Sequence, residues 1–266
     1  LVNPRVGHEQ EYTFAPAEKR RKVMIVGSGP AGLYAAYAAS ARGHEVSVYE
    51  EQDKLGGQFR IAALPPAKSL LTGPLRFWIQ EGKKQGVRYL TNTAVTKKLV
   101  EQEHPDVVIL ATGARQTKPA IEGIDGKNVF MANDVLEGRA VVGRNVLIAG
   151  AGLVGLETAD FLRERAGRKS TLIDMVPAIN YGVLGVGTHL KARLDANDTR
   201  YILNASIIRF TEHGVVYRQG ESEKTAEGFD SIIIAMGSRS YNPLEAELKD
   251  LDCEVYVIGD ASQAGQ

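Results

Sequence analysis

The feature that most constrains this chain is an apolar run that leads into three closely spaced glycines. Residues 23–26, Val-Met-Ile-Val, are predicted to form a short buried strand. Gly27, Gly29 and Gly32 follow in the spacing G-x-G-x-x-G, and an alanine-rich helix is expected over residues 33–41. Gly27 would allow a sharp turn, Gly29 a close approach to a pyrophosphate, and Gly32 tight packing of helix on strand. The helix N-terminus would add unpaired N–H groups and about half a positive charge.

An acidic residue completes this pattern. A second predicted strand, residues 45–49, ends at Glu50, eighteen residues after Gly32. A carboxylate at about this spacing typically accepts hydrogen bonds from a ribose. Strand, glycines, helix, second strand and acid together predict a dinucleotide-binding site.

The same pattern then occurs a second time, 123 residues later (150 − 27). The second copy comprises a strand, three glycines, a helix, another strand and an acid: residues 145–149, Gly150, Gly152, Gly155, residues 156–166, residues 170–173 and Asp174. The offset is too long for a solenoid repeat, and it fits two separate mononucleotide-binding domains.

Three further strands end in residues that suit a ligand edge. The predicted strand 107–110 runs into Ala111-Thr112-Gly113, and the strand 231–234 runs into Ala-Met-Gly at 235–237. Small residues at the carboxyl end of a strand let the backbone approach a ligand at the open edge of a parallel sheet. A last strand, beginning at residue 254, is expected to deliver Asp260 at its carboxyl end.

The segments between these motifs give weaker predictions. Residues 1–22 are expected to be an extended lead-in whose basic run, 19–22, forms a solvated collar. Residues 54–60, with two glycines, are predicted to be a loop beside the cofactor. A helix is expected over 69–85 with Trp78 in the core, and a small hairpin over 215–224.

Composition excludes several other classes of function. Lys plus Arg equals Asp plus Glu at 32 each, so neither nucleic acid nor an anionic membrane is an expected partner. No apolar run approaches the ~20 residues of a membrane span, and no signal peptide is expected. A single cysteine, Cys253, excludes an internal disulfide and a C-x-x-C pair, which favours a cytoplasmic location. The five histidines show no metal-ligand spacing, and Leu at position 1 indicates a processed chain or part of a larger one.

Taken together, the two glycine motifs, the Ala-Thr-Gly and Ala-Met-Gly strand ends and the terminal Gly-Asp resemble the two-dinucleotide-binding flavoproteins. The lead-in Leu1-Val2-Asn3-Pro4-Arg5-Val6-Gly7-His8-Glu9 narrows the resemblance. It is similar to the segment that joins an iron–sulfur motif to the FAD domain in the group of 2,4-dienoyl-CoA reductase, 2-enoate reductase and trimethylamine dehydrogenase. The resemblance covers essentially all 266 residues.

The resemblance implies an α/β fold with two Rossmann-like domains, as in glutathione reductase. The lead-in 1–22 would follow an absent iron–sulfur segment. Residues 23–117 and 246–266 would form a discontinuous FAD domain, and the NAD(P)H domain, 118–245, would be inserted into it.

The resemblance also implies the cofactor-binding residues. FAD would be held by Gly27, Gly29, Pro30, Ala31, Gly32, Glu50, Gly57, Gln58, Arg60, Ala111, Thr112, Gly113, Gly259 and Asp260. The nicotinamide cofactor would be held by Gly150, Gly152, Leu153, Val154, Gly155 and Asp174. Glu157 would approach the nicotinamide end or remain on the helix surface. Asp174 favours NADH over NADPH, because a 2′-phosphate would meet a carboxylate, although Arg168 and Lys169 lie close in sequence.

The function implied is an electron-input module that passes hydride from NADH to FAD. Electrons would then reach an iron–sulfur cluster and an FMN-bearing barrel, both outside this chain, to reduce an activated C=C substrate of the enoate or dienoyl-CoA kind. No catalytic residue and no metal ligand is assigned in the chain itself. Two alternatives stay open: a non-catalytic domain that holds ADP or FAD, and a ferredoxin- or disulfide-reductase-like flavoprotein. Assembly into a homo-oligomer also stays open.

Overall fold

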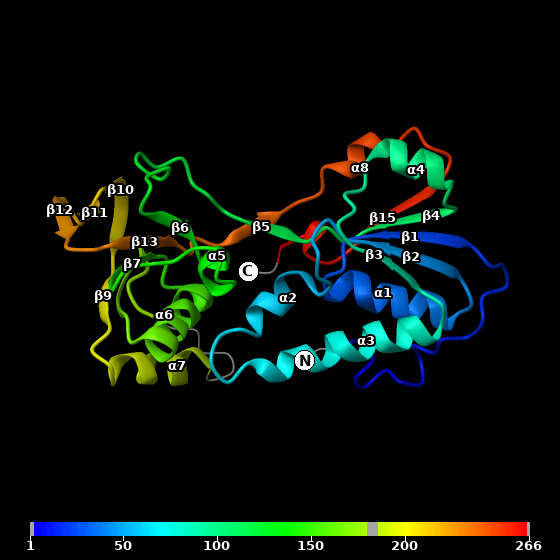
Figure 1. Ribbon diagram of the computed structural model, residues 1–266, viewed down its shortest axis with the longest axis horizontal. Helices are drawn as coiled ribbons and strands as arrows, with labels where there is room; N and C mark the ends of the chain where they lie inside the picture. The colour runs from blue at the N-terminus through cyan, green and yellow to red at the C-terminus, as the bar shows by residue number, and fades with distance from the viewer. Residues whose placement is uncertain (1–2, 180–185, 265–266) are drawn as a thin grey trace. The chain divides into compact units, whose positions relative to one another are not determined.

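The computed structural model describes residues 3–179 and 186–264 (Figure 1). Leu1 and Val2 of the lead-in, and residues 265–266 at the end of the predicted FAD domain, lie outside the described residues. The chain divides into two compact units. Unit 1 runs up to Ala63 and includes Leu70–Arg115 and the chain from Arg239 onward, and unit 2 comprises Leu64–Ser69 and Gln116–Ser238.

Unit 1 is built on a five-stranded parallel sheet of order β15-β4-β1-β2-β3 (Figure 1). Its strands are β1 (Lys22–Val26), β2 (Glu45–Tyr49), β3 (Arg88–Leu90), β4 (Val107–Leu110) and β15 (Glu254–Val257). Both faces of the central strand are buried, as expected of a parallel sheet. Val23 and Ile25 pack on the face that carries α1 (Pro30–Ala41), and Met24 and Val26 pack on the opposite face.

Short helices complete unit 1. They are α2 (Gly57–Ala62), α3 (Thr72–Lys84), α4 (Lys97–Glu103) and α8 (Leu244–Glu247), with 3₁₀ turns at Ser69–Leu71 and Gly259–Ala261. Helix α3 packs beside α1, where Leu33 is fully buried against Leu75 and Trp78. The prediction that Trp78 belongs to the core is confirmed, because its exposed fraction is 6%.

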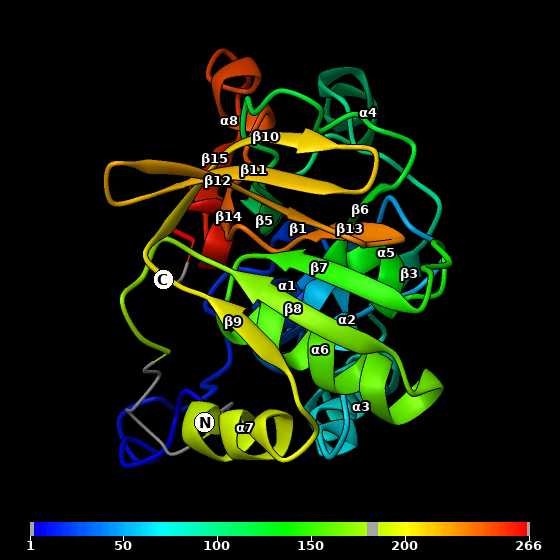
Figure 2. The ribbon, with the colours of Figure 1, turned by 90° about the vertical axis from the view of Figure 1, so that its left-hand side faces the viewer.

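Unit 2 repeats the same architecture. Its five-stranded parallel sheet has the order β6-β13-β7-β8-β9 (Figure 2). The strands are β6 (Val129–Met131), β7 (Asn145–Ala149), β8 (Lys169–Ile173), β9 (Arg200–Ile202) and β13 (Ser231–Ile234). Strand β7 takes the central place that β1 has in unit 1, so the internal repeat seen in the sequence is also a repeat of topology.

Different layers cover the two faces of the sheet in unit 2. One face packs against α5 (Ala132–Leu136), α6 (Leu153–Ala166) and α7 (Val186–Asp195). The other packs against an antiparallel sheet of β10 (Ala205–Thr211), β11 (Gly214–Gln219) and β12 (Ser222–Glu227) (Figure 2). A separate two-stranded sheet joins β5 (Ala114–Gln116) to β14 (Ser238–Ser240).

Several local predictions were wrong. Residues 57–60 of the predicted loop begin helix α2 instead. The helix expected over 69–85 is a 3₁₀ turn followed by α3, and the hairpin expected over 215–224 belongs to a three-stranded sheet that includes β10. The last strand ends at Val257 rather than reaching Asp260. The lead-in contains turns between residues 4 and 11, because carbonyls there accept local hydrogen bonds such as His8 N to Arg5 O.

Helix α4 carried no prediction and forms because Thr96 caps it: the Thr96 hydroxyl accepts a hydrogen bond from Leu99 N at 3.3 Å. Helices α1 and α6 begin three residues earlier than expected, at Pro30 and Leu153, because the glycine before each serves as N-cap. Within the described residues, no helix has the length and apolar character needed to cross a membrane.

Candidate nucleotide-binding sites

The glycines of the first motif are required by close backbone contacts. Gly27 has φ +100°, and a side chain there would overlap the carbonyl oxygen of Ala111. A Cβ at Gly32 would overlap the carbonyl oxygen of Gly27 and lie 3.3 Å from the Cβ of Ala111. A Cβ at Gly29 would meet nothing within 4 Å. The first and third glycines therefore close the turn, whereas Gly29 leaves the space in front of the helix open.

The helix N-terminus faces this open space. Gly29 is the N-cap of α1, with φ −66° and ψ −179°, and no side chain caps the helix. Pro30 occupies the first position, where a missing N–H costs nothing. The remaining N–H groups and the positive end of the helix dipole suit a phosphate.

The acid of the first motif is held by the glycine loop itself. Glu50 is buried, with an exposed fraction of 7%. Its Oε2 accepts hydrogen bonds from Ser28 N at 3.0 Å and Ser28 Oγ at 2.6 Å, and its Oε1 accepts one from Gln52 N at 2.9 Å. The end of β2 and the loop after β1 are thereby fixed to each other.

Two more predicted residues abut this loop. A Cβ at Gly57 would lie 3.0 Å from Gly29 Cα, and a Cβ at Gly259 would lie 2.7 Å from the Cβ of Ala31. The structure therefore brings the start of α2 and the 3₁₀ turn after β15 against the N-terminus of α1. We use the name first cradle for the following residues: Gly27, Gly29, Pro30, Ala31, Gly32, Glu50, Gly57, Ala111 and Gly259.

The remaining residues predicted for FAD lie on the segments that flank the first cradle. Gln58 donates a hydrogen bond to Ala114 O, and Thr112 donates one to Tyr241 O at 2.5 Å. Gly113 O accepts a hydrogen bond from Tyr241 N at 2.9 Å. Arg60 is half-buried on α2, and Asp260 is exposed on the last 3₁₀ turn.

The second motif reproduces this geometry in unit 2. Gly150 has φ +109°, and a Cβ there would overlap the carbonyl oxygen of Ala235. A Cβ at Gly155 would overlap the carbonyl oxygen of Gly150. Gly152 is the N-cap of α6, with φ −69° and ψ 177°. We call these residues, with Asp174, the second cradle.

Asp174 is held as Glu50 is, but with fewer bonds. Its Oδ2 accepts a hydrogen bond from Ala151 N at 2.6 Å, and its Oδ1 accepts one from Val176 N at 3.2 Å. Leu153 and Val154 are the first two residues of α6 and are each 42% exposed. Two large apolar side chains in water beside an uncapped helix end leave apolar surface available to a ligand.

The third acid predicted for this region is paired with a lysine. Glu157 Oε1 lies 2.6 Å from Lys68 Nζ, and the two side chains are 12% and 28% exposed. The pair lies within unit 2, since Lys68 belongs to its short N-terminal segment. Ala67, just before the lysine, has φ +61°, which is unusual for a residue with a side chain.

Sequence reasoning missed Lys68. It also missed two aspartates, one in each unit, that join neighbouring strands at the amino ends of those strands. Asp106 Oδ2 accepts a hydrogen bond from Lys22 N at 2.6 Å, and Asp230 Oδ2 accepts bonds from Asn145 N and Arg144 N at 2.8 and 2.9 Å. These backbone donors lower the pKa of Asp230 below its ordinary value. The signal was present, because each aspartate directly precedes a strand that is followed by an alanine, Ala111 or Ala235.

Three of the four basic side chains of the run 19–22 are paired with acids rather than available to a ligand. They contact acids at the amino-terminal edge of the sheet in unit 1: Arg20 with Glu45 at 3.8 Å, Lys22 with Glu103 at 3.1 Å, and Arg21 with Glu254. This agrees with the expected solvated collar, since the three basic side chains are 72%, 35% and 39% exposed.

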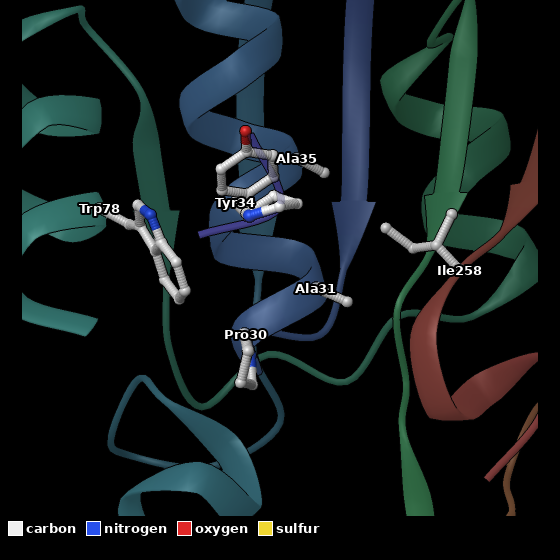
Figure 3. A pocket seen from close by; sticks show the side chains of 7 residues that line it. Pro30, Ala31, Tyr34, Ala35, Trp78 and Ile258 are labelled. Atoms are coloured by element: carbon white, nitrogen blue, oxygen red, sulfur yellow. The ribbon is translucent and has the colours of Figure 1, made fainter. Parts of the chain in front are cut away.

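An apolar pocket of about 310 Å³ lies on the outer side of α1. Figure 3 shows Trp78 and Ile258 on opposite sides of this helix, with Pro30, Ala31 and Tyr34 between them. The pocket shares Pro30 and Ala31 with the first cradle but has no charged lining residue. Its chemistry does not suit a pyrophosphate. Among the described residues, no group of His, Cys, Asp and Glu side chains is arranged to hold a metal.

Comparison with known proteins gives relatives for the whole chain. It is 33% identical over 278 residues to the NADH oxidase of Thermoanaerobacter brockii, and 34% identical over 275 residues to the cinnamate reductase of Clostridium sporogenes. These matches cover 100% and 98% of this chain but only 42% and 39% of the relatives. The chain therefore spans about two fifths of the length of these relatives.

A solved structure also resembles the whole chain. A 2-naphthoyl-CoA reductase in complex with 2-naphthoyl-CoA superposes with a TM-score of 0.92 at 30% identity, over 100% of this chain and 41% of that one. Residues 21–263 match the pyridine nucleotide-disulphide oxidoreductase family. The predicted fold class, two Rossmann-like FAD- and NAD(P)-binding domains, is confirmed. The chain belongs to the pyridine nucleotide-disulphide oxidoreductases, a family of FAD-dependent NAD(P)H oxidoreductases.

Proposed function

We propose that this chain is the electron-input part of a larger reductase, in which NADH bound in unit 2 reduces FAD bound in unit 1. The observation that carries the proposal is the duplicated cradle. Each copy has a closed glycine turn, an open helix N-terminus and a carboxylate fixed by that turn. Both copies are intact, so two dinucleotides are expected rather than one.

In unit 1, the residues present fit the adenosine-pyrophosphate half of FAD. The open side of Gly29 admits a pyrophosphate to the uncapped N-terminus of α1. Glu50 would accept a hydrogen bond from a ribose hydroxyl, and the exposed Asp260 would face the ribityl chain. We assign FAD to residues 23–117 and 246–266 and the nicotinamide cofactor to residues 118–245.

In unit 2, charge favours NADH over NADPH. Asp174 would meet the 2′-phosphate of NADPH, and the two like charges would repel. Arg168, which is close in sequence, is committed elsewhere: its Nε donates to the carbonyls of Val142 and Gly143 at 3.0 and 2.8 Å. These partners lie before the amino end of β7, whereas Asp174 follows the carboxyl end of β8. Arg168 therefore supports no phosphate beside Asp174.

The protein's contribution would be positioning and exclusion of water rather than covalent chemistry. Bound FAD would accept hydride from NADH and supply electrons to an iron–sulfur cluster and an FMN-bearing barrel elsewhere in the full-length protein. The apolar Leu153 and Val154 would keep water from the nicotinamide cofactor. The Lys68–Glu157 pair would hold the second turn of α6 in place next to them.

Relatives support the class of substrate. Similar proteins include a cinnamate reductase and a 2-naphthoyl-CoA reductase. We therefore propose an activated C=C, of the enoate or enoyl-CoA kind, as the substrate of the full-length enzyme. A single cysteine fits a reducing, cytoplasmic setting.

The test is an anaerobic titration of the FAD-loaded chain with NADH and, separately, NADPH. We expect NADH to bleach the flavin absorbance near 450 nm and NADPH to do so only at higher concentration. Binding of FAD without bleaching by either cofactor would reject the electron-input role. In that case a domain that merely holds FAD would be the better description.

A further inference from the structure

The serine between the first two glycines of unit 1 is unusually placed. Ser28 is fully buried, with an exposed fraction of 0%. A buried hydroxyl is costly unless it is hydrogen-bonded. The Ser28 hydroxyl donates to Glu50 Oε2 at 2.6 Å and accepts a second, longer hydrogen bond from Gly56 N at 3.3 Å, while the Ser28 carbonyl oxygen accepts from the same N–H at 3.0 Å. One side chain thus links the glycine loop, the acid after β2 and the segment that begins α2.

The second cradle shows that this hydroxyl is not needed to build the fold. Ala151 occupies the equivalent position and is also fully buried. Its backbone N–H bonds Asp174 at 2.6 Å, just as Ser28 N bonds Glu50 at 3.0 Å. The backbone link is common to both cradles, and only the hydroxyl link is specific to unit 1.

The hydroxyl changes what Glu50 can offer to a ligand. A carboxylate has about four acceptor positions, two on each oxygen. Ser28 takes both positions of Oε2, and Gln52 N takes one on Oε1. Among the contacts of the described residues, the position left on Glu50 is therefore on Oε1. Asp174, by contrast, keeps one position on each of its two oxygens.

We propose that Ser28 is a positioning residue of the nucleotide site in unit 1. Its hydroxyl holds Oε2 of Glu50 so that Oε1 meets the adenosine ribose, and it supplements the backbone bond from Gly56 N to the Ser28 carbonyl oxygen. The same reasoning assigns different ribose recognition to the two cradles. Glu50 would accept a hydrogen bond from one ribose hydroxyl, and Asp174 would accept hydrogen bonds from two. This inference rests on the proposed function only in that unit 1 must bind a ribonucleotide.

The experiment compares Ser28→Ala with Ser40→Ala in the whole chain. Ser40 is a matched control, because it is also a buried serine, and its Oγ bonds Ala36 O at 2.7 Å and Gln85 at 2.6 Å. FAD binding is followed by quenching of flavin fluorescence. FAD is then displaced with ADP and with 2′,3′-dideoxy-ADP, so that the readout comes from the FAD site alone.

Because Ser28→Ala loses one charge-assisted hydrogen bond, ADP should bind about fivefold to tenfold more weakly to this variant, as measured by the ADP concentration that displaces FAD. Displacement by 2′,3′-dideoxy-ADP should stay within about twofold of the unmodified chain. Ser40→Ala should leave the affinity for both nucleotides unchanged. Gly56 N keeps its 3.0 Å hydrogen bond to the Ser28 carbonyl oxygen in both variants, so the difference between ADP and 2′,3′-dideoxy-ADP reports on Glu50. Equal weakening of both nucleotides, or no weakening of ADP, would overturn the proposal. If the unmodified chain bound no FAD, the flavin assignment itself would fail instead.

Discussion

Gly29 and Gly32 of the first cradle should respond to substitution by alanine in opposite ways. Gly29→Ala places a methyl group in open space, at φ −66° and ψ −179°, which alanine adopts freely. The following Pro30 favours the same extended backbone. Alanine is a poorer N-cap than glycine, but it also restricts the unfolded chain by about 0.4–1 kcal/mol. The free energy of unfolding without nucleotide should therefore change by less than about 0.5 kcal/mol.

Gly32→Ala should act on the fold instead. Its Cβ would overlap the carbonyl oxygen of Gly27, 3.1 Å from the carbonyl carbon and 3.3 Å from the Cβ of Ala111. The neighbours are backbone and strand-end atoms that cannot swing aside, so we take the upper end of the usual overpacking cost, about 3 kcal/mol. Alanine in a helix returns about 1 kcal/mol. The net loss is about 2 kcal/mol, or ~4–8 °C in Tm.

Binding should show the reverse order. The Gly29→Ala methyl group would fill the approach to the helix N-terminus, and FAD should bind about tenfold to a hundredfold more weakly. Denaturant unfolding without nucleotide and FAD titration by fluorescence measure the two effects separately. Gly155→Ala in unit 2 is the matched control, because it repeats the backbone clash of Gly32→Ala away from the first cradle. The reasoning is refuted if Gly29→Ala unfolds as readily as Gly32→Ala, or binds FAD normally.

Three other outcomes are expected. Ala67→Gly should raise the free energy of unfolding by about 0.5–1 kcal/mol, measured by denaturant titration, because it relieves φ +61° at a modest entropic cost. Burial, followed by the charges of Arg42 and Arg21, lowers the pKa of His44, whose Nδ1 accepts a hydrogen bond from Arg21 N at 3.2 Å. Because folding favours the neutral ring, the contribution of His44 to protein stability should be complete above pH ~6.5 and lost as the pH falls toward the lowered pKa. His44→Gln should flatten this part of the pH–Tm profile. An unchanged profile would contradict the assignment. Asp174→Asn should raise the ratio of NADPH to NADH affinity about tenfold in titrations of bound cofactor, and a constant ratio would argue against charge as the basis of preference.

Unbroken apolar runs followed by spaced glycines made the two central βαβ units predictable from sequence. Residues 23–26 and 145–149 are nearly all apolar and lead directly into glycines, so strand, turn and helix could each be placed. Helix α2 was missed because Gly56 and Gly57 suggested a loop, although the helix begins at the second glycine. Strand β10 was missed because a bulge between Ile207 and Arg209 interrupts its alternation.

Contacts between distant residues set the limit on predicting the sites. Lys68 and Glu157 are 89 positions apart, and no local spacing connects them. Ser28 stood at an unspecified position of the glycine motif, and its role depends on where the chain places Glu50 and Gly56. Motifs specify backbone that must approach a ligand, whereas the side chains that orient the acids become evident only in three dimensions.

The two cradles therefore share a backbone and differ in the side chains that tune it. Both use a glycine turn closed on the carbonyl of a small strand-end residue, Ala111 in one and Ala235 in the other. Unit 1 adds the Ser28 hydroxyl, which ties its acid to α2 and suits a cofactor that stays bound. Unit 2 has Ala151 there and leaves its acid with fewer internal bonds, which suits a cofactor that must leave after each reaction. If nicotinamide cofactor were to dissociate from unit 2 as slowly as FAD from unit 1, this division of roles would be wrong.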